Sequence, residues 1–249
     1  QMCIRDRITP LGRESEWFAA QIRYARKLVS IYGKETPLFY NLFAVPRTIE
    51  FMQNGIGHPV HLSDWLRQEP NKLTHVLDVI SDDYAELAKA LVEEAKVDGI
   101  YLSVNNISYD EVTEEAYRSI IAPYEKKILE AANRAGGENI LHICGYHGFH
   151  NHLSWYREYP FLAVNWAAKV EGVSLSEGKK LFQGKAVIGG FGQTEKDLIY
   201  SGTEEAIKAE TRRLLDEAGR IGVILGADCT IPRDTPVSHL KWVREAANE

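Results

Sequence analysis

The sequence predicts a fold of the α/β class, built as a (β/α)8 TIM-type barrel. Two observations lead to this prediction: short apolar runs alternate with helical patterns along the chain, and no linker, repeat or low-complexity stretch divides it. Alternating β and α elements imply a parallel sheet. With 249 residues, of which 45% are hydrophobic, the chain is long enough for one barrel domain with a substantial core. An open doubly wound sheet is the alternative.

Six apolar runs have the length and the flanking glycine or proline residues that are typical of buried parallel strands. They span Pro37–Ala44, Gly99–Asn105, Glu138–Gly145, Phe161–Ala168, Lys185–Gly192 and Gly222–Cys229. A complete barrel has eight strands, so either some strands escape this pattern or an opening unit is missing. We expect a barrel that lacks its first βα unit. Its uncovered core and edge strands would favour a homo-oligomer.

Helical patterns separate these runs, with apolar residues at the spacing of a buried helix face. The first, near Glu14–Tyr32, is followed by Gly33, a residue type that commonly ends a helix. Pro123 predicts a kink or break in the helix around it. The remaining helices are expected near Thr48–Gln53, around Trp65 and Leu66, and over Leu73–Val97, Thr113–Ala135, Ser176–Phe182, Thr203–Arg220 and Pro236–Glu249.

Composition and charge limit the function classes. The net charge of −6 argues against a general nucleic-acid-binding protein and gives no reason to expect a membrane-surface role. No apolar run approaches the length of a membrane span, and no secretory signal pattern is recognised. Three cysteines are too few for a disulfide framework, as is typical of a reducing cytosol. We therefore expect a cytoplasmic protein with no nucleic-acid and no membrane partner.

The first residues do not lead into the helix that follows. The segment MCIRDR, Met2 to Arg7, resembles the translation of a sequencing-library adapter. We expect residues 1–7 to be a non-native leader, in which Cys3 has no role. Residues 8–249 are then expected to form a single barrel domain.

One histidine and two cysteines lie where two of the predicted strands end. His142 and Cys144 are two residues apart in one strand, so their side chains point to the same face and can bind one metal together. Cys229 ends another strand, and a barrel gathers these strand ends at one mouth. One histidine and two cysteines with a fourth position open is an arrangement used for catalytic zinc. The alternative is a pair of buried cysteines beside a hydrogen-bonded histidine.

Other polar residues follow the same strand ends, where barrel enzymes place their active sites. We expect Asp228, beside Cys229, and His147, in a histidine-rich loop, to take part in catalysis. The alternative for Asp228 is that it points away from the site, because adjacent strand residues point to opposite faces. The alternative for His147 is a position in a solvated loop. Glu171 and Asp110 are further acid/base candidates. The residues expected to bind substrate are Asn41, Asn105, Asn165 and Trp166.

Four segments carry a resemblance to a known family. They read PLFYNLFAVPRTIEFM, IIAPYEKKILEAANRAGGENILHICG, KAVIGGFGQTEKDLIYSGTEEAIKAETRRLLDEAG and GVILGADCTIPRDTPVSHLKWVREAA. The chain resembles the uroporphyrinogen decarboxylase superfamily from about residue 14 onward. Within it, the chain is most similar to the zinc-dependent, corrinoid-linked methyltransferases that act on coenzyme M and related thiols.

This resemblance implies a function. The methyltransferases carry a zinc-binding H-x-C…C pattern, and His142, Cys144 and Cys229 match it. The implied zinc would hold a small thiol substrate as a thiolate, which is a nucleophile at neutral pH. The implied methyl donor is a methyl-corrinoid supplied by a partner, the corrinoid protein. The chain has Asn105 and Asn106 where many of these methyltransferases have an acidic cluster, which leaves the substrate open.

Two alternatives come from other classes. The decarboxylase branch, which serves porphyrin biosynthesis, works without metal and would need basic groups for a tetrapyrrole or another polycarboxylate. Arg47 and Arg233 are the basic residues best suited to that role. The second alternative is a corrinoid- or tetrapyrrole-binding protein without catalysis.

Overall fold

The computed structural model of the chain describes residues 8–55, 62–106, 113–145 and 150–249. The chain divides into two compact units. The first comprises Gln1–Leu141 with Glu158–Phe161, and the second comprises His142–Arg157 with Leu162–Glu249. The single-domain expectation for residues 8–249 therefore stays a prediction. No helix in the described ranges is both long and apolar enough to cross a membrane.

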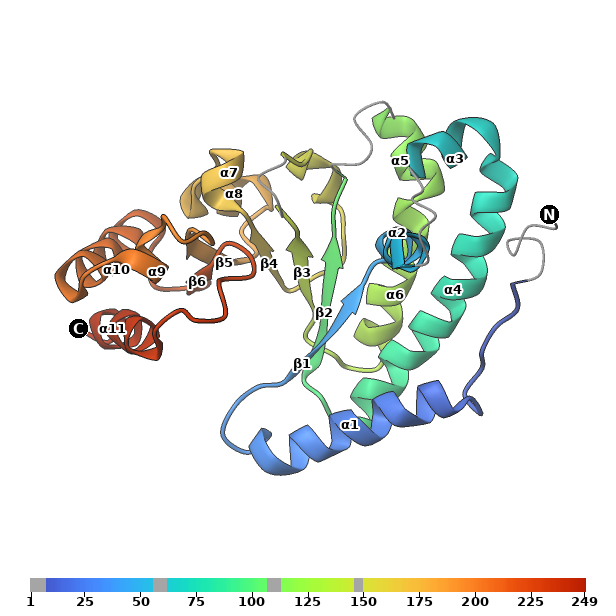
Figure 1. The fold of residues 1–249 in the computed structure, drawn as a ribbon, viewed down its shortest axis with the longest axis horizontal. Coiled ribbons are helices and arrows are strands. Elements are labelled where there is room, and N and C mark those ends of the chain that lie inside the picture. The colour runs from blue at the N-terminus through green and yellow to red at the C-terminus, as the bar shows by residue number, and fades with distance from the viewer. Residues whose placement is uncertain (1–7, 56–61, 107–112, 146–149) are drawn as a thin grey trace. The chain divides into compact units, whose positions relative to one another are not determined.

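In the described part of the chain, six strands form one sheet, and each strand neighbours the next one along the chain (Figure 1). The pairs β1–β2, β4–β5 and β5–β6 are parallel. Consecutive order is the order of a barrel, whereas a doubly wound sheet reverses its order at a switch point. The predicted α/β class is confirmed, and each predicted run contains one strand. The strands are β1 (Phe39–Phe43), β2 (Gly99–Val104), β3 (Ile140–Ile143), β4 (Ala163–Trp166), β5 (Ala186–Phe191) and β6 (Val223–Ala227).

The helices of the first unit follow the predicted pattern. The helix expected over Thr113–Ala135 is divided at Ile121, because Pro123 lacks the N–H group that a continuous helix would use. The long fourth helix ends in a π-helical turn. The elements are α1 (Glu16–Tyr32), α2 (Val45–Gly55), α3 (Leu62–Gln68), α4 (Pro70–Ala90), η2 (Leu91–Ala95), α5 (Glu114–Ile120) and α6 (Ala122–Arg134).

A buried carboxyl group connects three segments of the first unit. Glu125 of α6 is 1% exposed, and its Oε2 accepts hydrogen bonds from Tyr117 of α5 at 2.8 Å and Tyr159 at 2.6 Å. Burial raises the pKa of Glu125 to about 7, although both hydrogen bonds act in the opposite direction. The group is therefore half neutral near physiological pH.

Among its described residues, the second unit contains three helices that the sequence predicted and three short ones that it did not. The three short helices are η5 (Leu153–Tyr156), α7 (Ala168–Glu171) and α9 (Leu198–Ser201). Each has about one turn, which is too short to show a hydrophobic period in the sequence. Helix α8 begins with a capping box, in which Ser174 and Glu177 exchange hydrogen bonds. The longer helices are α8 (Leu175–Leu181), α10 (Glu204–Ala218) and α11 (Val237–Ala247).

Helix α8 packs against a tryptophan of β4. Trp166 is fully buried, its Nε1 donates to the Val173 carbonyl at 3.0 Å, and its ring lies beside Phe182. Gly178 faces the same ring with no space for a side chain. Trp166 is therefore part of the core between β4 and α8.

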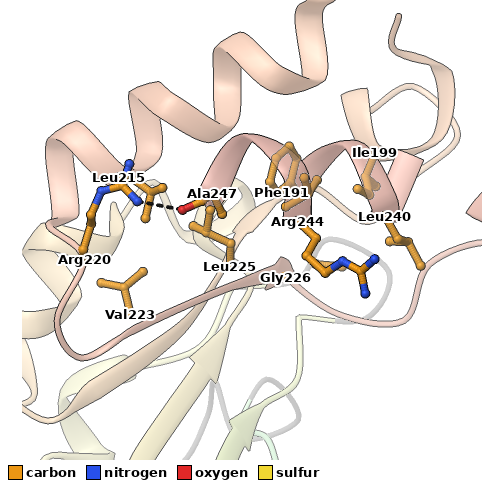
Figure 2. Close-up of a pocket in the computed structure, with 12 residues that line it drawn as sticks. Phe191, Ile199, Leu215, Arg220, Val223, Leu225, Gly226, Leu240, Arg244 and Ala247 are labelled. Carbon is orange, nitrogen blue, oxygen red and sulfur yellow. Dashed lines mark hydrogen bonds between the residues drawn. The ribbon is translucent and has the colours of Figure 1, made fainter. Parts of the chain in front are cut away.

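An apolar cavity of about 430 Å³ lies between β6 and helices α10 and α11. Figure 2 shows its lining, with Arg220 and Arg244 at different ends. Arg220 donates from Nη1 to the Ala247 carbonyl at 2.6 Å, which ties the end of α11 beside the cavity. None of the predicted site residues that the structure describes lines this cavity.

Gly178→Ala should destabilise the protein. A Cβ at this position would lie 2.1 Å from Cη2 of Trp166, far inside contact distance. Alanine stabilises a helix interior by about 0.5–1 kcal/mol relative to glycine, whereas overpacking costs about 1–3 kcal/mol or more. Thermal unfolding should show a net loss of stability. Lys180→Ala, on the exposed side of α8, is the control and should change stability by less than about 0.5 kcal/mol.

Glu125→Gln should remove a pH dependence of stability. The folded-state pKa of about 7 lies above the ordinary value of 4.5. The contribution of the neutral carboxyl group to stability is therefore fully present below pH 4.5 and is lost as the pH rises through about 7. Between about pH 5 and about pH 8, the wild-type free energy of unfolding should fall by on the order of 2–3 kcal/mol more than that of the variant. Urea unfolding at both pH values measures the difference.

The control for that experiment is Glu130→Gln, on the exposed side of α6. It should keep the wild-type pH dependence, because its carboxyl group is not buried. An identical pH dependence in wild type and Glu125→Gln would show that the buried carboxyl group does not titrate as described.

Candidate metal centre

The second unit brings together the three residues that the sequence predicted as metal ligands. His142 lies in β3, Cys144 follows that strand, and Cys229 follows β6. The Cys229 Sγ atom is 3.8 Å from Cys144 Sγ and 3.5 Å from His142 Nε2. One ligand atom from each residue lies within 4.8 Å of the others. His142 is buried, and both cysteines are partly buried.

These distances suit a tetrahedral zinc ion. Zinc binds sulfur at about 2.3 Å and imidazole nitrogen at about 2.0–2.1 Å. Tetrahedral angles then place two sulfur ligands about 3.8 Å apart, and a sulfur and a nitrogen ligand about 3.5 Å apart. The two sulfur atoms are 3.8 Å apart, and Cys229 Sγ and His142 Nε2 are 3.5 Å apart, in agreement with these values. The donor set therefore fits zinc in its chemistry and in two of its three ligand separations, and the third is at most 4.8 Å.

The surroundings of Cys229 favour its thiol form when no cation is bound. The adjacent Cys144 and, secondarily, burial raise the pKa of the Cys229 thiol to about 12. His142 acts in the opposite direction but does not compensate. A cysteine that binds metal does so as a thiolate, so metal binding at this place would release protons.

Asn165 of β4 contacts the histidine directly. Its Oδ1 atom lies 2.5 Å from His142 Nδ1, on the side of the ring away from the cysteine contact. Its Nδ2 donates to the carbonyl groups of Ile188 at 2.8 Å and Ala227 at 3.3 Å. Asn165 was expected to bind substrate, and that role stays a prediction; in the structure its oxygen contacts His142 Nδ1.

Asp228 is buried beside Cys229 and holds two backbone groups. Its Oδ1 accepts from the Gly190 N–H at 3.0 Å, and its Oδ2 accepts from the Lys169 N–H at 2.9 Å. Burial raises the pKa of Asp228 to about 6, against the effect of these hydrogen bonds. Gly190 has a φ of 104°, which favours glycine at this point of β5. The catalytic role expected for Asp228 stays a prediction.

A second group of hydrogen bonds fixes the backbone around Cys144. Asn151 donates from Nδ2 to the Cys144 carbonyl at 3.0 Å and to Glu171 at 3.2 Å. Glu171 also accepts from the Asn151 N–H at 2.7 Å, and Gln193 donates to the Gly145 carbonyl at 3.2 Å. Sequence reasoning missed Asn151 and Gln193, because a side chain that supports a loop carbonyl leaves no spacing signal.

Of the other predicted residues, Trp166 is described within the same unit and lies away from this centre. Trp166 lies in the core against α8, because it follows Asn165 in the strand and so points to the opposite face. Asn41 and Asn105 belong to the first unit, where Asn41 is exposed and Asn105 is buried, and their role stays a prediction. His147, Asp110 and the expected leader with Cys3 lie outside the described residues.

Comparison with known proteins identifies the family. The family model of uroporphyrinogen decarboxylase (URO-D) matches residues 7–249. The chain belongs to the uroporphyrinogen decarboxylase family. The family resemblance carried by the four quoted segments is therefore confirmed.

Two curated relatives of this URO-D family chain are methyltransferases by name. The methylcobamide:CoM methyltransferase MtbA of Methanosarcina acetivorans is 28% identical over 217 residues, which are 87% of this chain and 59% of that protein. MtbA of Methanosarcina mazei is 28% identical over 245 residues, which are 97% of this chain and 67% of that protein. The chain thus spans about three fifths to two thirds of the length of these relatives.

A solved structure shares the fold. It is described as a methyltransferase from Methanosarcina mazei, and it covers 91% of this chain and 63% of its own length with a TM-score of 0.71. The sequence identity is 21%, so this likeness speaks to the arrangement of strands and helices alone.

Asp228→Ala should destabilise the second unit. The change leaves the N–H groups of Lys169 and Gly190 without their acceptor, which should cost on the order of 2–4 kcal/mol. Chemical unfolding with a chelator present measures this cost without any contribution from bound metal. Asp216→Ala, on the exposed side of α10, is the control. Equal stability of both variants would show that the two backbone hydrogen bonds contribute nothing.

Proposed function

We propose that this chain is the zinc-binding part of a methyltransferase that transfers a methyl group from a methyl-corrinoid protein to a small thiol. The observation that carries the proposal is the cluster of one nitrogen and two sulfur ligands, His142, Cys144 and Cys229, within 4.8 Å of one another, with two of the three separations at the tetrahedral zinc values. The names of the two curated relatives, both methylcobamide:CoM methyltransferases, support the same reaction class.

Three protein ligands leave one tetrahedral position for the sulfur of the substrate. Zinc, when bound, would supply the positive charge that keeps this sulfur deprotonated at neutral pH. His142, Cys144 and Cys229 would hold that charge in place. The deprotonated sulfur would then accept the methyl group from the corrinoid of the partner.

Burial and loop support prepare the ligands for this role. His142 is 6% exposed, so water does not compete freely for its ring. Asn151 donates to the backbone carbonyl of Cys144 and to Glu171, which limits the movement of that ligand. Ligands fixed before binding lose less entropy when the metal arrives.

The decarboxylase alternative needs basic groups that are available to a polycarboxylate. Of the two arginines considered for that role, Arg47 donates to Glu50 at 2.6 Å, and Glu50 is itself buried. This pairing disfavours Arg47 as a substrate-binding group. The methyltransferase is therefore the preferred proposal.

Zinc content tests the proposal. Protein purified without chelators should contain about one zinc ion per chain by elemental analysis. Cys144→Ser and Cys229→Ser should each weaken zinc binding by at least about 100-fold, because a hydroxyl group is a poor replacement for a thiolate. The control is Cys3→Ser, which changes a cysteine outside the described residues and should retain the metal.

The zinc-loaded protein should then methylate coenzyme M with methylcobamide as donor, and both ligand variants should lose this activity. A metal-free protein whose unfolding temperature does not change when zinc is added would refute the zinc site. Zinc binding without methyl transfer to any thiol would refute the reaction.

A further inference from the structure

We infer that Asn165 is a positioning residue that fixes the protonation pattern of the His142 ring, so that Nε2 and not Nδ1 is free to bind a metal. The inference deepens the proposed function and rests on it. It follows from the hydrogen-bonding capacities of five polar groups in the second unit.

The first step concerns the orientation of the Asn165 amide. Its Nδ2 lies 2.8 Å from the Ile188 carbonyl oxygen and 3.3 Å from the Ala227 carbonyl oxygen. Carbonyl oxygens only accept hydrogen bonds, so the group that faces them must be the NH2 group. A flipped amide would place its own oxygen against two carbonyl oxygens. The oxygen of Asn165 therefore faces His142.

The second step concerns the histidine ring. Oδ1 of Asn165 has no hydrogen to donate, so His142 Nδ1, at 2.5 Å, must carry one. A neutral imidazole ring has a single N–H group, so Nε2 then carries the acceptor lone pair of the ring. Nε2 is the atom that lies 3.5 Å from Cys229 Sγ. The lone pair is thus on the nitrogen at the candidate metal centre.

The third step concerns the hydrogen-bonding groups of the Asn165 amide and their access to substrate. Both hydrogens of its amide nitrogen are directed at backbone carbonyl groups, and its oxygen is directed at His142. Asn165 is 2% exposed, so neither water nor substrate reaches these groups easily. This assignment replaces the substrate-binding role that its position at a strand end suggested.

Two substitutions separate an effect on His142 from an effect on the strands. Asn165→Asp keeps an acceptor for His142 Nδ1 but loses both donors to Ile188 and Ala227. Asn165→Leu loses the acceptor as well. If Asn165 acts through His142, Asn165→Leu should weaken zinc binding about 10–100-fold, and Asn165→Asp should restore most of that loss. Both variants should unfold at lower temperature than wild type.

Zinc affinity is measured by competition with a chromophoric chelator on the full chain at one pH, and unfolding temperature is measured separately on zinc-free protein. Asn139→Leu is the matched control, since it removes a buried amide from the first unit. It should lower the unfolding temperature and leave zinc affinity unchanged. Asn165→Leu with wild-type zinc affinity, or equal zinc affinities in Asn165→Leu and Asn165→Asp, would overturn the inference.

A measurement on wild type covers the case in which a variant does not fold. Nitrogen-15 NMR of zinc-free protein, recorded where the His142 ring shows a single N–H group, should place that hydrogen on Nδ1. Protonation at Nε2 would overturn the inference. Failure of the wild type to bind zinc would refute the proposed function, whereas the ring tautomer tests the role of Asn165 independently of any metal.

Discussion

A buried amide that must be fully hydrogen-bonded organises the candidate metal centre. Asn165 lies in β4, and water cannot satisfy its polar atoms because the side chain is 2% exposed. It donates to carbonyl groups of β5 and β6 and contacts His142 of β3. One side chain therefore connects four strands, among them β3, which contains His142, and β6, which precedes Cys229.

The other polar residues of the second unit mostly hold backbone. Asp228 accepts from two N–H groups, and Asn151 supports the carbonyl of Cys144. Cys144 and Cys229 both lie just beyond the ends of their strands, where the sheet hydrogen bonds no longer fix the chain. Beyond the strand ends, side-chain hydrogen bonds to the backbone fix the chain instead. This structural role accounts for the polar side chains near Cys144 and Cys229.

The first unit shows the same use of polar groups for structure. Glu125 is buried and is satisfied by Tyr117 and Tyr159, and no metal-ligand cluster of histidine, cysteine or carboxylate groups was found among the described residues of that unit. Its pKa of about 7 leaves the carboxyl group partly neutral, which lowers the cost of burying it. Perturbed acids therefore occur in both units, and only geometry distinguishes a structural acid from a functional one.

The sequence alone determined the strands, most of the helices and the three candidate ligand residues that the structure brings together. Hydrophobic periodicity is a local property, and two residues in one strand share a face wherever that strand lies, so His142 and Cys144 could be paired in advance. Tertiary structure decided the roles of the neighbours. Asn165 and Trp166 are adjacent and looked equivalent, yet the alternation of the strand sends one to His142 and the other into the core. The contacts that decide these roles join residues far apart in the chain, and no local pattern records them.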